Sequence, residues 1–329
     1  MKHRSSNEKQ WIVITGAAGF IGSAVVRDLN DQGLFHLILV DDFKKSEKWK
    51  NLARKKFIDI ISKFEIFDWL VGKEKEIAAI IHLGACSDTM EMDNDYLLKN
   101  NYKFTIQMAE YALKNNLRFI YASSAGTYGD GSFGFSDDHS LIDSLHPLSM
   151  YAFSKQLFDL WAKRENVLDR IVGLKYFNVF GPNEYHKGHM ASMVYKMMKK
   201  VQLDGKLQLY KSTDPKYKDG EQCRDFIYVK DAARMTTLFL QNKVGGIFNI
   251  GRGEPVTWNA LSLALFHALK KKAVIEYVDM PRELVSQYQN YTAAEMKKFF
   301  SLFTDFSCTS IEDAVHDYVK NYLLRGERW

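Results

Sequence analysis

Tyr151 and Lys155 are separated by four positions in the stretch YAFSK. On a helix this spacing places the phenol and the ammonium on the same face, about one turn apart. A phenol titrates near ~10 in water, and a neighbouring positive charge lowers its pKa towards the range where it works as a base. The spacing by itself is more often that of a tyrosine at the edge of the core beside a surface-reaching lysine. The rest of the chain decides between the two interpretations.

A loop serine and a lysine between two histidines are the other candidate reactive groups. Ser124 follows a predicted strand, where its hydroxyl could bind a substrate oxygen, although a loop serine alone is more often a helix cap. Lys187 lies between His186 and His189. The imidazoles could suggest a metal, but no carboxylate or thiolate completes a ligand set, so no metal site is predicted.

Three evenly spaced glycines follow the first predicted strand. Residues 11–15 (WIVIT) form a short apolar run typical of a buried strand. Gly16, Gly19 and Gly22 come next and lead into residues 23–30, which have helical patterning. Glycines allow a tight turn and close backbone approach to a ligand, while a helix N-terminus attracts phosphate. Strand, glycine loop and helix in this order predict a dinucleotide-binding site.

An acidic pair ends the second predicted strand, residues 37–40. Asp41 and Asp42 come about twenty residues after the glycine loop, where a carboxylate can accept hydrogen bonds from an adenosine ribose. Basic residues follow at Lys44, Lys45, Lys48, Lys50 and Arg54. Most of them fit a solvated helix face, yet one or two could hold a 2′-phosphate. The residues alone therefore leave NAD and NADP open.

Strands and helices continue to alternate along the first half of the chain. Further strands are predicted at residues 79–83, 118–121 and 171–177, and a helix runs from Tyr151 to about Asn166. Small residues follow the first two of these strands and would let a ligand lie across the carboxyl edge of the sheet. The pattern predicts an α/β protein with a doubly wound parallel sheet of the Rossmann type.

The later part of the chain is expected to form a smaller, mixed C-terminal lobe that binds substrate. All five prolines lie there, at Pro147, Pro182, Pro215, Pro255 and Pro281. No repeat or flexible linker separates the parts, so the lobes are expected to interleave. The nucleotide-binding domain is predicted to comprise residues 1–177 plus about 225–250, and the lobe residues 178–224 and about 251–329.

Composition narrows the class of protein. The chain of 329 residues has 46% apolar and 26% charged residues and a net charge of +5, as expected for a soluble enzyme that meets anionic small molecules. Nothing in it requires nucleic acid. Cys86, Cys223 and Cys308 show no metal or disulfide spacing, which favours free thiols in a reducing compartment. No signal-like or membrane-spanning apolar run is seen, so a cytoplasmic protein that does not enter a membrane is predicted.

With these pieces in place, the chain resembles the extended short-chain dehydrogenase/reductase family. The motifs that carry the resemblance span most of the chain: TGAAGFIG (15–22), HLGA (82–85), YASSAGTYG (121–129), YAFSK (151–155), YFNVFGP (176–182) and RDFIYVKD (224–231). The resemblance implies a Rossmann domain, a bound nicotinamide cofactor and a nucleotide-sugar substrate held by the C-terminal lobe.

Three narrower stretches resemble one branch of that family. They are GACSDT (84–89), NEYHKGHMAS (183–192) and YQNYT (288–292). Members of this branch invert carbon 6 of an ADP-heptose for lipopolysaccharide core assembly, usually with NADP. The resemblance implies that Tyr151 and Lys187 are the two acid/base groups, that Lys155 holds the cofactor ribose, and that Ser124 is a hydroxyl partner. The alternative for Lys187 is a lysine that binds phosphate. It also implies a homo-oligomer, with a pentamer or decamer as the expected form.

The resemblance and the motifs together give two sets of binding residues. The cofactor is expected at Gly16, Gly19, Phe20, Ile21, Gly22, Asp41, Asp42, Lys48, Lys63, Leu83, Gly84, Ala85, Cys86, Ser87, Asn100, Tyr151, Lys155, Val179 and Lys187. The substrate is expected at Ser124, Asn178, His189, Lys196, Tyr210, Lys211, Ser212, Thr213, Arg224 and Tyr288.

The substrate set contains departures from the family's pattern. His189 stands where a serine is expected, and Lys196 where a histidine is expected. The run 210–213 (YKST) replaces a Phe-Glu-Gly-Ser-like run, and residues 213–222 are longer and more charged than expected. These differences bear on substrate contacts and leave the redox chemistry unaffected.

Other functions compete with this interpretation. A 4-epimerase of the same family needs only one base and would leave Lys187 idle. A 4,6-dehydratase needs an Asp-Glu pair beside the active-site hydroxyl, whereas this chain has Ser124-Ala125 there. A dinucleotide-sensing regulator would need the glycine loop but not Tyr151 and Lys155. A nucleic-acid-binding protein has only residues 44–56 in its favour, without a recognised module.

Overall fold

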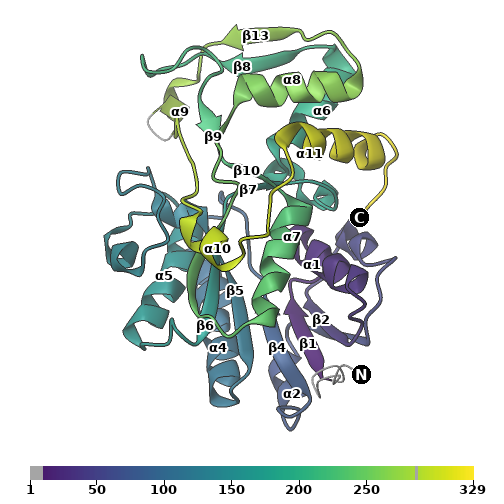
Figure 1. The fold of residues 1–329 in the computed structure, drawn as a ribbon, viewed down its shortest axis with the longest axis vertical. Coiled ribbons are helices and arrows are strands. Elements are labelled where there is room, and N and C mark those ends of the chain that lie inside the picture. The colour runs from purple at the N-terminus through teal and green to yellow at the C-terminus, as the bar shows by residue number, and fades with distance from the viewer. Residues whose placement is uncertain (1–9, 286–287) are drawn as a thin grey trace.

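The computed structural model describes residues 10–285 and 288–329 (Figure 1). A sheet of seven parallel strands lies at its centre, in the order β11-β6-β5-β4-β1-β2-β3. Its strands are β1 (Trp11–Thr15), β2 (Leu37–Asp41), β3 (Asp59–Ser62), β4 (Ile77–His82), β5 (Arg118–Ser124), β6 (Ile171–Tyr176) and β11 (Gly246–Ile250). The order 3-2-1-4-5-6 is that of a Rossmann fold, and it confirms the predicted fold class.

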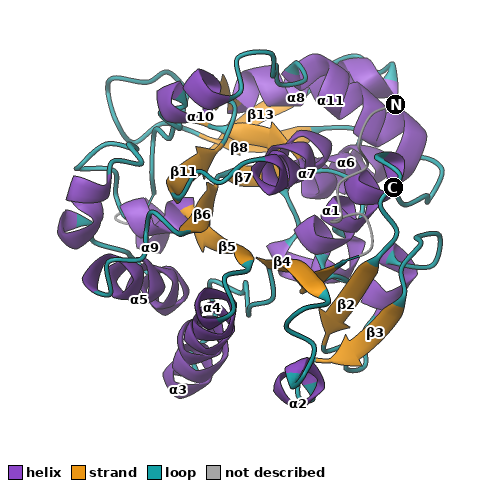
Figure 2. Ribbon diagram, turned by 60° about the horizontal axis from the view of Figure 1, so that its bottom comes forward, coloured by secondary structure: helices purple, strands orange, loops and turns teal. Residues whose placement is uncertain are grey.

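Helices cover both faces of this sheet. The helices of the described chain are α1 (Phe20–Asp31), α2 (Ile66–Leu70), α3 (Asn94–Leu97), α4 (Phe104–Lys114), α5 (Met150–Arg164), α6 (Met193–Asp204), α7 (Val229–Leu238), α8 (Trp258–Leu269), α9 (Arg282–Val285), α10 (Lys297–Leu302) and α11 (Ile311–Asp317), and those from α6 onward include helices that pack on the small strand pairs instead. Figure 2 shows α4 and α5 on one side of the strands and α1 and α7 on the other.

Two hydrophobic clusters follow from this layering. Successive strand residues point to opposite faces, so Val13 and Ile14 of β1 belong to different clusters. Val13 packs in the cluster that contains Phe158 of α5, and Ile14 in the cluster that contains Val25 of α1. Because both faces are buried, the strands read as continuous apolar runs, which is why they are visible in the sequence.

The remaining strands are short and lie beyond the carboxyl edge of the sheet. They pair two by two: β7 (Asn178–Phe180) with β10 (Phe226–Tyr228), β9 (Cys223–Arg224) with β12 (Val256–Thr257), and β8 (Leu207–Tyr210) with β13 (Ile275–Val278). In Figure 1, β8, β13 and α8 form the upper part of the molecule, far from the amino ends of the large sheet.

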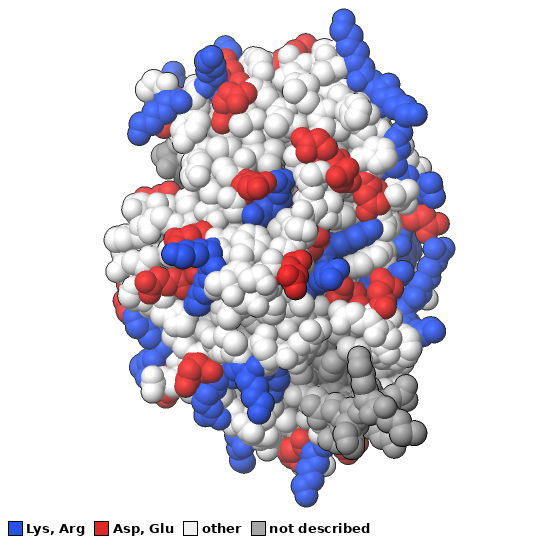
Figure 3. Space-filling model, viewed as in Figure 1, with Lys and Arg blue, Asp and Glu red and all other residues white. Residues whose placement is uncertain are grey.

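The surface carries no block of one charge on the face drawn in Figure 3, where lysines and arginines alternate with aspartates and glutamates. No helix in the described part of the chain is both long enough and apolar enough to cross a membrane.

Candidate active site

The glycine loop at the end of β1 is fixed by close backbone contacts. Gly16 has a φ of +67°, and a Cβ there would lie 2.7 Å from Gly84. A Cβ on Gly22 would lie 2.0 Å from the Gly16 carbonyl oxygen. Only glycine fits either position, because the backbone of the loop lies in direct contact with the backbone at the end of β4 and with its own first residue. The N-terminus of α1 has no side-chain cap at Gly19, which leaves its N–H groups to bind phosphate.

The two aspartates after β2 have different partners. Asp41 is buried and accepts hydrogen bonds from the Ala18 backbone N–H at 2.7 Å and from Lys48 Nζ at 2.5 Å. Asp42 lies with its carboxylate 3.4 Å from Lys63 Nζ and 3.9 Å from Lys44 Nζ. Asp41 therefore holds the glycine loop in place. Asp42, Lys44 and Lys63 are the charged groups available to bind a ribose or a 2′-phosphate.

A cavity of about 350 Å³ lies between the glycine loop and the ends of β2, β4 and β5. Most of the predicted cofactor residues line it: Gly16, Gly19, Phe20, Ile21, Gly22, Asp41, Asp42, Lys48, Lys63, Leu83, Gly84, Ala85, Ser87, Asn100 and Lys187. Cys86, Tyr151, Lys155 and Val179 are not among its lining residues. Lys44, Tyr96 and His186 line it as well, and none of these was in the predicted set.

Helix α5 carries the predicted base at its first turn. The Ser149 hydroxyl accepts from the Ala152 N–H at 3.2 Å and caps the helix. Lys155 is buried and donates to the Ala122 carbonyl oxygen at 2.9 Å, at the wall of the cavity. Burial lowers the pKa of Lys155 to about 8. Burial raises the pKa of Tyr151, and the Ser124 hydroxyl opposes that shift.

The protein's own groups therefore leave the Tyr151 phenol protonated at neutral pH. The sequence predicted that Lys155, helped by the positive ring of a cofactor, lowers the phenol pKa; within the protein alone, burial acts in the opposite direction. A further positive charge beside the phenol is needed to make it a base, and a nicotinamide ring would bring one.

Sequence reasoning overlooked Asn101, which connects the helix to the cavity wall. Its side chain accepts from the Cys86 N–H at 2.8 Å, donates to the Cys86 carbonyl at 2.9 Å, and donates to Ser154 Oγ at 3.1 Å. Asn101 is 1% exposed and lies in a π-helical stretch, Leu98–Lys103, between α3 and α4. The adjacent Asn100 was predicted to bind the cofactor instead, because nothing in a single sequence distinguishes the two amide side chains.

A buried carboxylate also holds the loop that carries Lys187. Glu184 accepts from the Gly181 N–H at 3.2 Å, from Ser192 Oγ at 2.7 Å and from the Tyr318 hydroxyl at 2.9 Å. Lys187 Nζ lies 5.3 Å from the centre of the Phe20 ring. Burial lowers the pKa of Lys187, which favours a lysine that can exchange a proton.

The two histidines of this loop do not form a metal site. Burial and the neighbouring Lys187 lower the pKa of His186 to about 4, and its Nδ1 lies 3.3 Å from the Asn51 amide nitrogen. His189 is exposed and lies 3.2 Å from the Asp88 carboxylate. Within residues 10–285 and 288–329, no group of three or more side chains is arranged to bind a metal ion.

Asn178, Arg224 and Tyr288, which were predicted to bind substrate, do not line this cavity. Arg224 stacks 5.0 Å from the Tyr288 ring and 5.9 Å from the Trp258 ring, and Trp258 donates to the Tyr288 hydroxyl at 2.8 Å. Asn178 donates to the Asp225 carbonyl at 3.1 Å. Arg224 and Tyr288 are thus brought together from strand β9 and a distant segment.

The other predicted substrate residues are scattered. Lys211 pairs with Asp279 on the surface at 3.0 Å, and the Ser212 N–H binds Asp219 at 2.8 Å. The structure therefore groups Arg224 with Tyr288. Burial raises the pKa of Tyr288, and Tyr210 lies near enough to add to that shift. Burial lowers the pKa of Lys187, and Lys196 lies near enough to lower it further.

A profile of the NAD dependent epimerase/dehydratase family matches residues 12–251. The chain belongs to this family. It is 46% identical over 318 residues to a Nitratidesulfovibrio vulgaris protein named ADP-L-glycero-D-manno-heptose-6-epimerase, with 96% of this chain and 98% of that protein covered.

Two solved structures show that the fold alone does not distinguish heptose 6-epimerases from 4-epimerases. The Helicobacter pylori ADP-L-glycero-D-manno-heptose-6-epimerase superposes with a TM-score of 0.77 at 26% identity, covering 97% of each chain. A UDP-N-acetylglucosamine 4-epimerase from Methanobrevibacter ruminantium superposes with a TM-score of 0.76 at 25% identity, covering 96% of this chain and 99% of that one. The fold is shared by both kinds of epimerase, so sequence identity and site residues must distinguish them.

The chain is an enzyme with isomerase chemistry that depends on a nicotinamide dinucleotide. Its residues fit such a group. The glycine loop leaves no room for a Cβ at Gly16 or Gly22, and α1 presents an uncapped N-terminus to the cavity. Asp42 with Lys44 and Lys63 lies at the end of the cavity where a ribose would be recognised.

Proposed function

We propose that this enzyme converts ADP-D-glycero-β-D-manno-heptose into ADP-L-glycero-β-D-manno-heptose by inverting carbon 6 of the heptose. The observation that carries the proposal is the 46% identity, over nearly the whole of both chains, to the Nitratidesulfovibrio vulgaris heptose-6-epimerase. The product would serve lipopolysaccharide core assembly. Lys187 at the cavity supports it further, because a second base beside Tyr151 is what an exocyclic carbon requires.

The chemistry explains why two bases are useful. Carbon 6 has no acidic C–H, so the inversion would need hydride chemistry, which a nicotinamide dinucleotide held at the glycine loop and the N-terminus of α1 would supply through a 6-keto sugar. Because carbon 6 lies outside the ring, rotation about its bond to the ring presents either face and turns the oxygen in two directions. Tyr151 serves one direction and Lys187 the other. Ser124 hydrogen-bonds the oxygen, and Lys155 binds the cofactor ribose.

NADP is the proposed form of the cofactor. Lys44 and Lys63 flank Asp42 within 3.9 Å and 3.4 Å, and both line the cavity. Two ammonium groups there favour a 2′-phosphate, whereas a lone carboxylate would favour a free ribose. Extraction of the purified enzyme and chromatography of the released dinucleotide tests this directly. NAD in place of NADP would contradict it.

The decisive assay supplies ADP-D-glycero-β-D-manno-heptose without added reductant and follows both epimers by NMR in deuterated water. We expect conversion to the L-glycero epimer without net NADPH formation and without deuterium at carbon 6, because the same hydride returns. Deuterium at carbon 6 would indicate proton chemistry. No conversion, with dinucleotide still bound, would favour a different nucleotide sugar, such as the substrate of a 4-epimerase.

Lys187→Met tests the second base against that alternative. We expect the interconversion of the epimers to fall by about 10²-fold or more, since a positioned acid/base group contributes that much. Lys199→Met, an exposed lysine of α6, is the matched control and should retain full activity. Interconversion at the wild-type rate in both directions by Lys187→Met would contradict the two-base mechanism.

Two further properties complete the proposal. Its dependence on a sugar nucleotide and a nicotinamide fits a cytoplasmic enzyme. A homo-oligomer, with a pentamer or decamer as the expected form, follows from the family resemblance, and light scattering of the purified enzyme checks it.

A further inference from the structure

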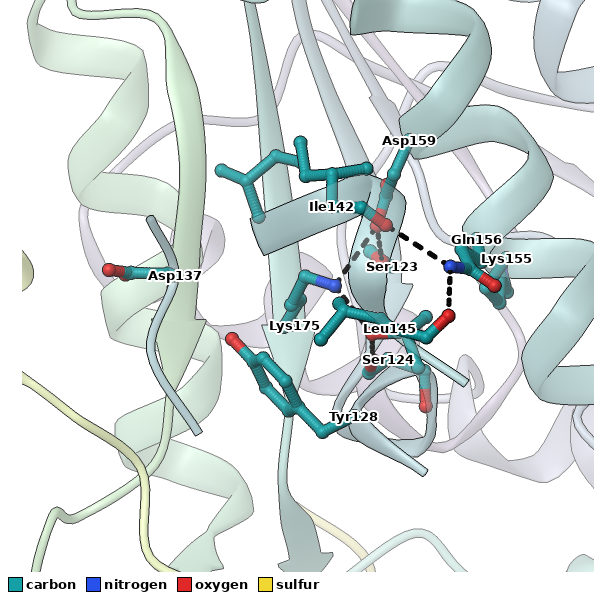
Figure 4. Close-up of polar contacts among 12 residues, drawn as sticks. Ser123, Ser124, Tyr128, Asp137, Ile142, Leu145, Lys155, Gln156, Asp159 and Lys175 are labelled. Carbon is teal, nitrogen blue, oxygen red and sulfur yellow. Dashed lines mark hydrogen bonds and ion pairs between the residues drawn. The ribbon is translucent and has the colours of Figure 1, made fainter. Parts of the chain in front are cut away.

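A buried ion pair lies directly behind the catalytic helix. Lys175 of β6 and Asp159 of α5 have their Nζ and Oδ2 atoms 3.2 Å apart, with side-chain exposures of 2% and 0% (Figure 4). Removing two charges from water is costly, and such a pair often stabilises a fold no better than apolar residues would. Neither residue lines the cavity. The pair therefore invites an explanation other than stability.

Asp159 and Lys175 together hold the segment on both sides of Ser124. The Asp159 carboxylate accepts from the Ser123 hydroxyl at 2.7 Å and from the Tyr121 hydroxyl at 2.8 Å. Lys175 Nζ donates to Thr127 Oγ1 at 2.5 Å. Ser124 lies between these anchored residues, at the junction of β5 and the following turn.

Asp159 also follows Lys155 by one helical turn, as Lys155 follows Tyr151. Residues four apart lie on the same helix face, so Asp159 and Lys155 share the face of α5 that packs against β5. On that face Lys155 Nζ binds the Ala122 carbonyl, and Asp159 binds Ser123 and Tyr121. Among the charges that act on Lys155, Asp159 is the largest that favours its protonated form, and it opposes burial.

The other groups that face this pair come from several elements. Cys86, in the loop after β4, also favours protonation of Lys155, while His82 of β4 lies close enough for the two to influence each other. Asp137 acts on Lys175, and His139 is influenced by Asp159. The Tyr128 ring centre lies 4.8 Å from Lys175 Nζ. None of these groups forms an ion pair with Asp159.

We propose that Asp159, fixed by Lys175, is a positioning residue that keeps Lys155 in its ammonium form and holds Ser124 in place from behind the sheet. The inference rests on the proposed function only in taking Lys155 and Ser124 as active-site groups. Lys175 matters because its Nζ contacts both the carboxylate, at 3.2 Å, and Thr127 Oγ1, and so ties α5 to the turn after Ser124.

The direct test is a pH titration of Lys155 by NMR, with lysine labelled at Cε and Lys155→Met used to assign the signal. The enzyme is studied as purified, with its dinucleotide. Asp159→Asn removes the charge but keeps the shape, and we expect the midpoint for Lys155 to fall by about one pH unit. Lys175→Met leaves the carboxylate and should not lower it. An unchanged midpoint in Asp159→Asn, or equal falls in both variants, overturns the proposal.

Asp159→Asn leaves Lys175 buried without a counter-charge, so this variant can fail to fold. The double variant Asp159→Asn/Lys175→Met removes both charges, and it should fold and show the same fall as Asp159→Asn. Loss of folding in the double variant as well would assign the pair to stability and overturn the inference. Asp143→Asn is the matched control, because Asp143 pairs with Lys163 of the same helix on the surface.

A kinetic measurement adds a second readout. We expect the alkaline limb of kcat in Asp159→Asn to move to lower pH by the same amount as the Lys155 titration, with Asp143→Asn unchanged. A fall in kcat at every pH without a shift would indicate a structural role only. If the wild-type enzyme does not turn over the ADP-heptose, the proposed function fails, while the NMR titration still decides the role of Asp159.

Discussion

The cofactor edge of the large sheet and the substrate side of the site are built differently. At the cofactor edge, polar side chains are buried and have defined partners, as Asp41 and Asn101 do. On the substrate side, His189 has 65% of its side chain exposed, and Lys211 has 48% exposed. The first region is preorganised for a ligand that stays bound through turnover. Among the residues predicted to bind substrate, His189 and Lys211 lie in water, whereas Arg224 and Tyr288 pack against each other.

This comparison predicts that the largest loss of turnover comes from changing Tyr151, which would contact both the cofactor and the substrate. Tyr151→Phe should lower turnover by about 10³-fold, because it removes an acid/base group, and should leave the amount of bound dinucleotide unchanged. Single-turnover kinetics and cofactor extraction measure the two quantities. Tyr96→Phe removes another phenol at the cavity and is the comparison variant. Loss of the cofactor in Tyr151→Phe would contradict the expectation that the cofactor edge binds its ligand independently of Tyr151.

Within the cofactor edge, His82 should make stability depend on pH. Its Nδ1 lies 2.6 Å from Thr15 Oγ1 and its Nε2 lies 3.0 Å from Thr105 Oγ1, and burial lowers its pKa to about 3. The unfolded chain binds a proton near pH 6.5, whereas the folded chain does not until about pH 3, so stability falls as pH falls through that window. The loss reaches about 5 kcal/mol at the acid end.

Denaturant unfolding at several pH values tests the role of His82. His82→Gln should remove one proton from the acid dependence, which flattens the slope by about 1.4 kcal/mol per pH unit. His316→Gln, at an exposed position of α11, should leave the slope unchanged. The same slope in wild type and His82→Gln would show that the acid sensitivity arises elsewhere.

On the substrate side, Arg224→Lys should mainly weaken substrate binding. The planar guanidinium stacks on Tyr288 at 5.0 Å, and a lysine cannot reproduce that stacking or a two-pronged contact with phosphate. We expect KM for the nucleotide sugar to rise about 10-fold, with kcat and thermal stability nearly unchanged. Steady-state kinetics separates these terms, and Arg234→Lys on α7 is the control. An equal fall in kcat would place Arg224 at the reacting carbon.

The smallest effect is expected at His189. Its contact with Asp88 is exposed, and such pairs contribute about 0–1 kcal/mol. His189→Ser, which introduces the family's usual residue, should change KM by less than about 5-fold and leave stability unchanged. A larger change in KM would show that the 185–190 loop closes on the substrate, and that the substrate side is more ordered than its exposure indicates.

Local sequence determined the frame of the site. Trp11–Thr15 was predicted as a strand with the bounds that the structure has, because buried parallel strands are continuous apolar runs. The glycine loop and the Tyr151–Lys155 helix were predicted because their signals lie within a few residues. Strand β3 (Asp59–Ser62) was missed, since two of its four residues are exposed and its sequence, DIIS, carries no clear pattern.

Only the tertiary structure decided which polar groups meet. Asn101 reaches Ser154 across 53 residues, and Glu184 reaches Tyr318 across 134. Asp41 and Asp42 are equal in sequence and both line the cavity, yet only Asp41 accepts hydrogen bonds from the Ala18 N–H and Lys48, while Asp42 lies beside Lys63 and Lys44. Hydrogen bonds and charge effects depend on distance in space, and sequence spacing fixes that distance only within one helix or strand. The fold and family could therefore be predicted, while the partners of the site's charges required the structure.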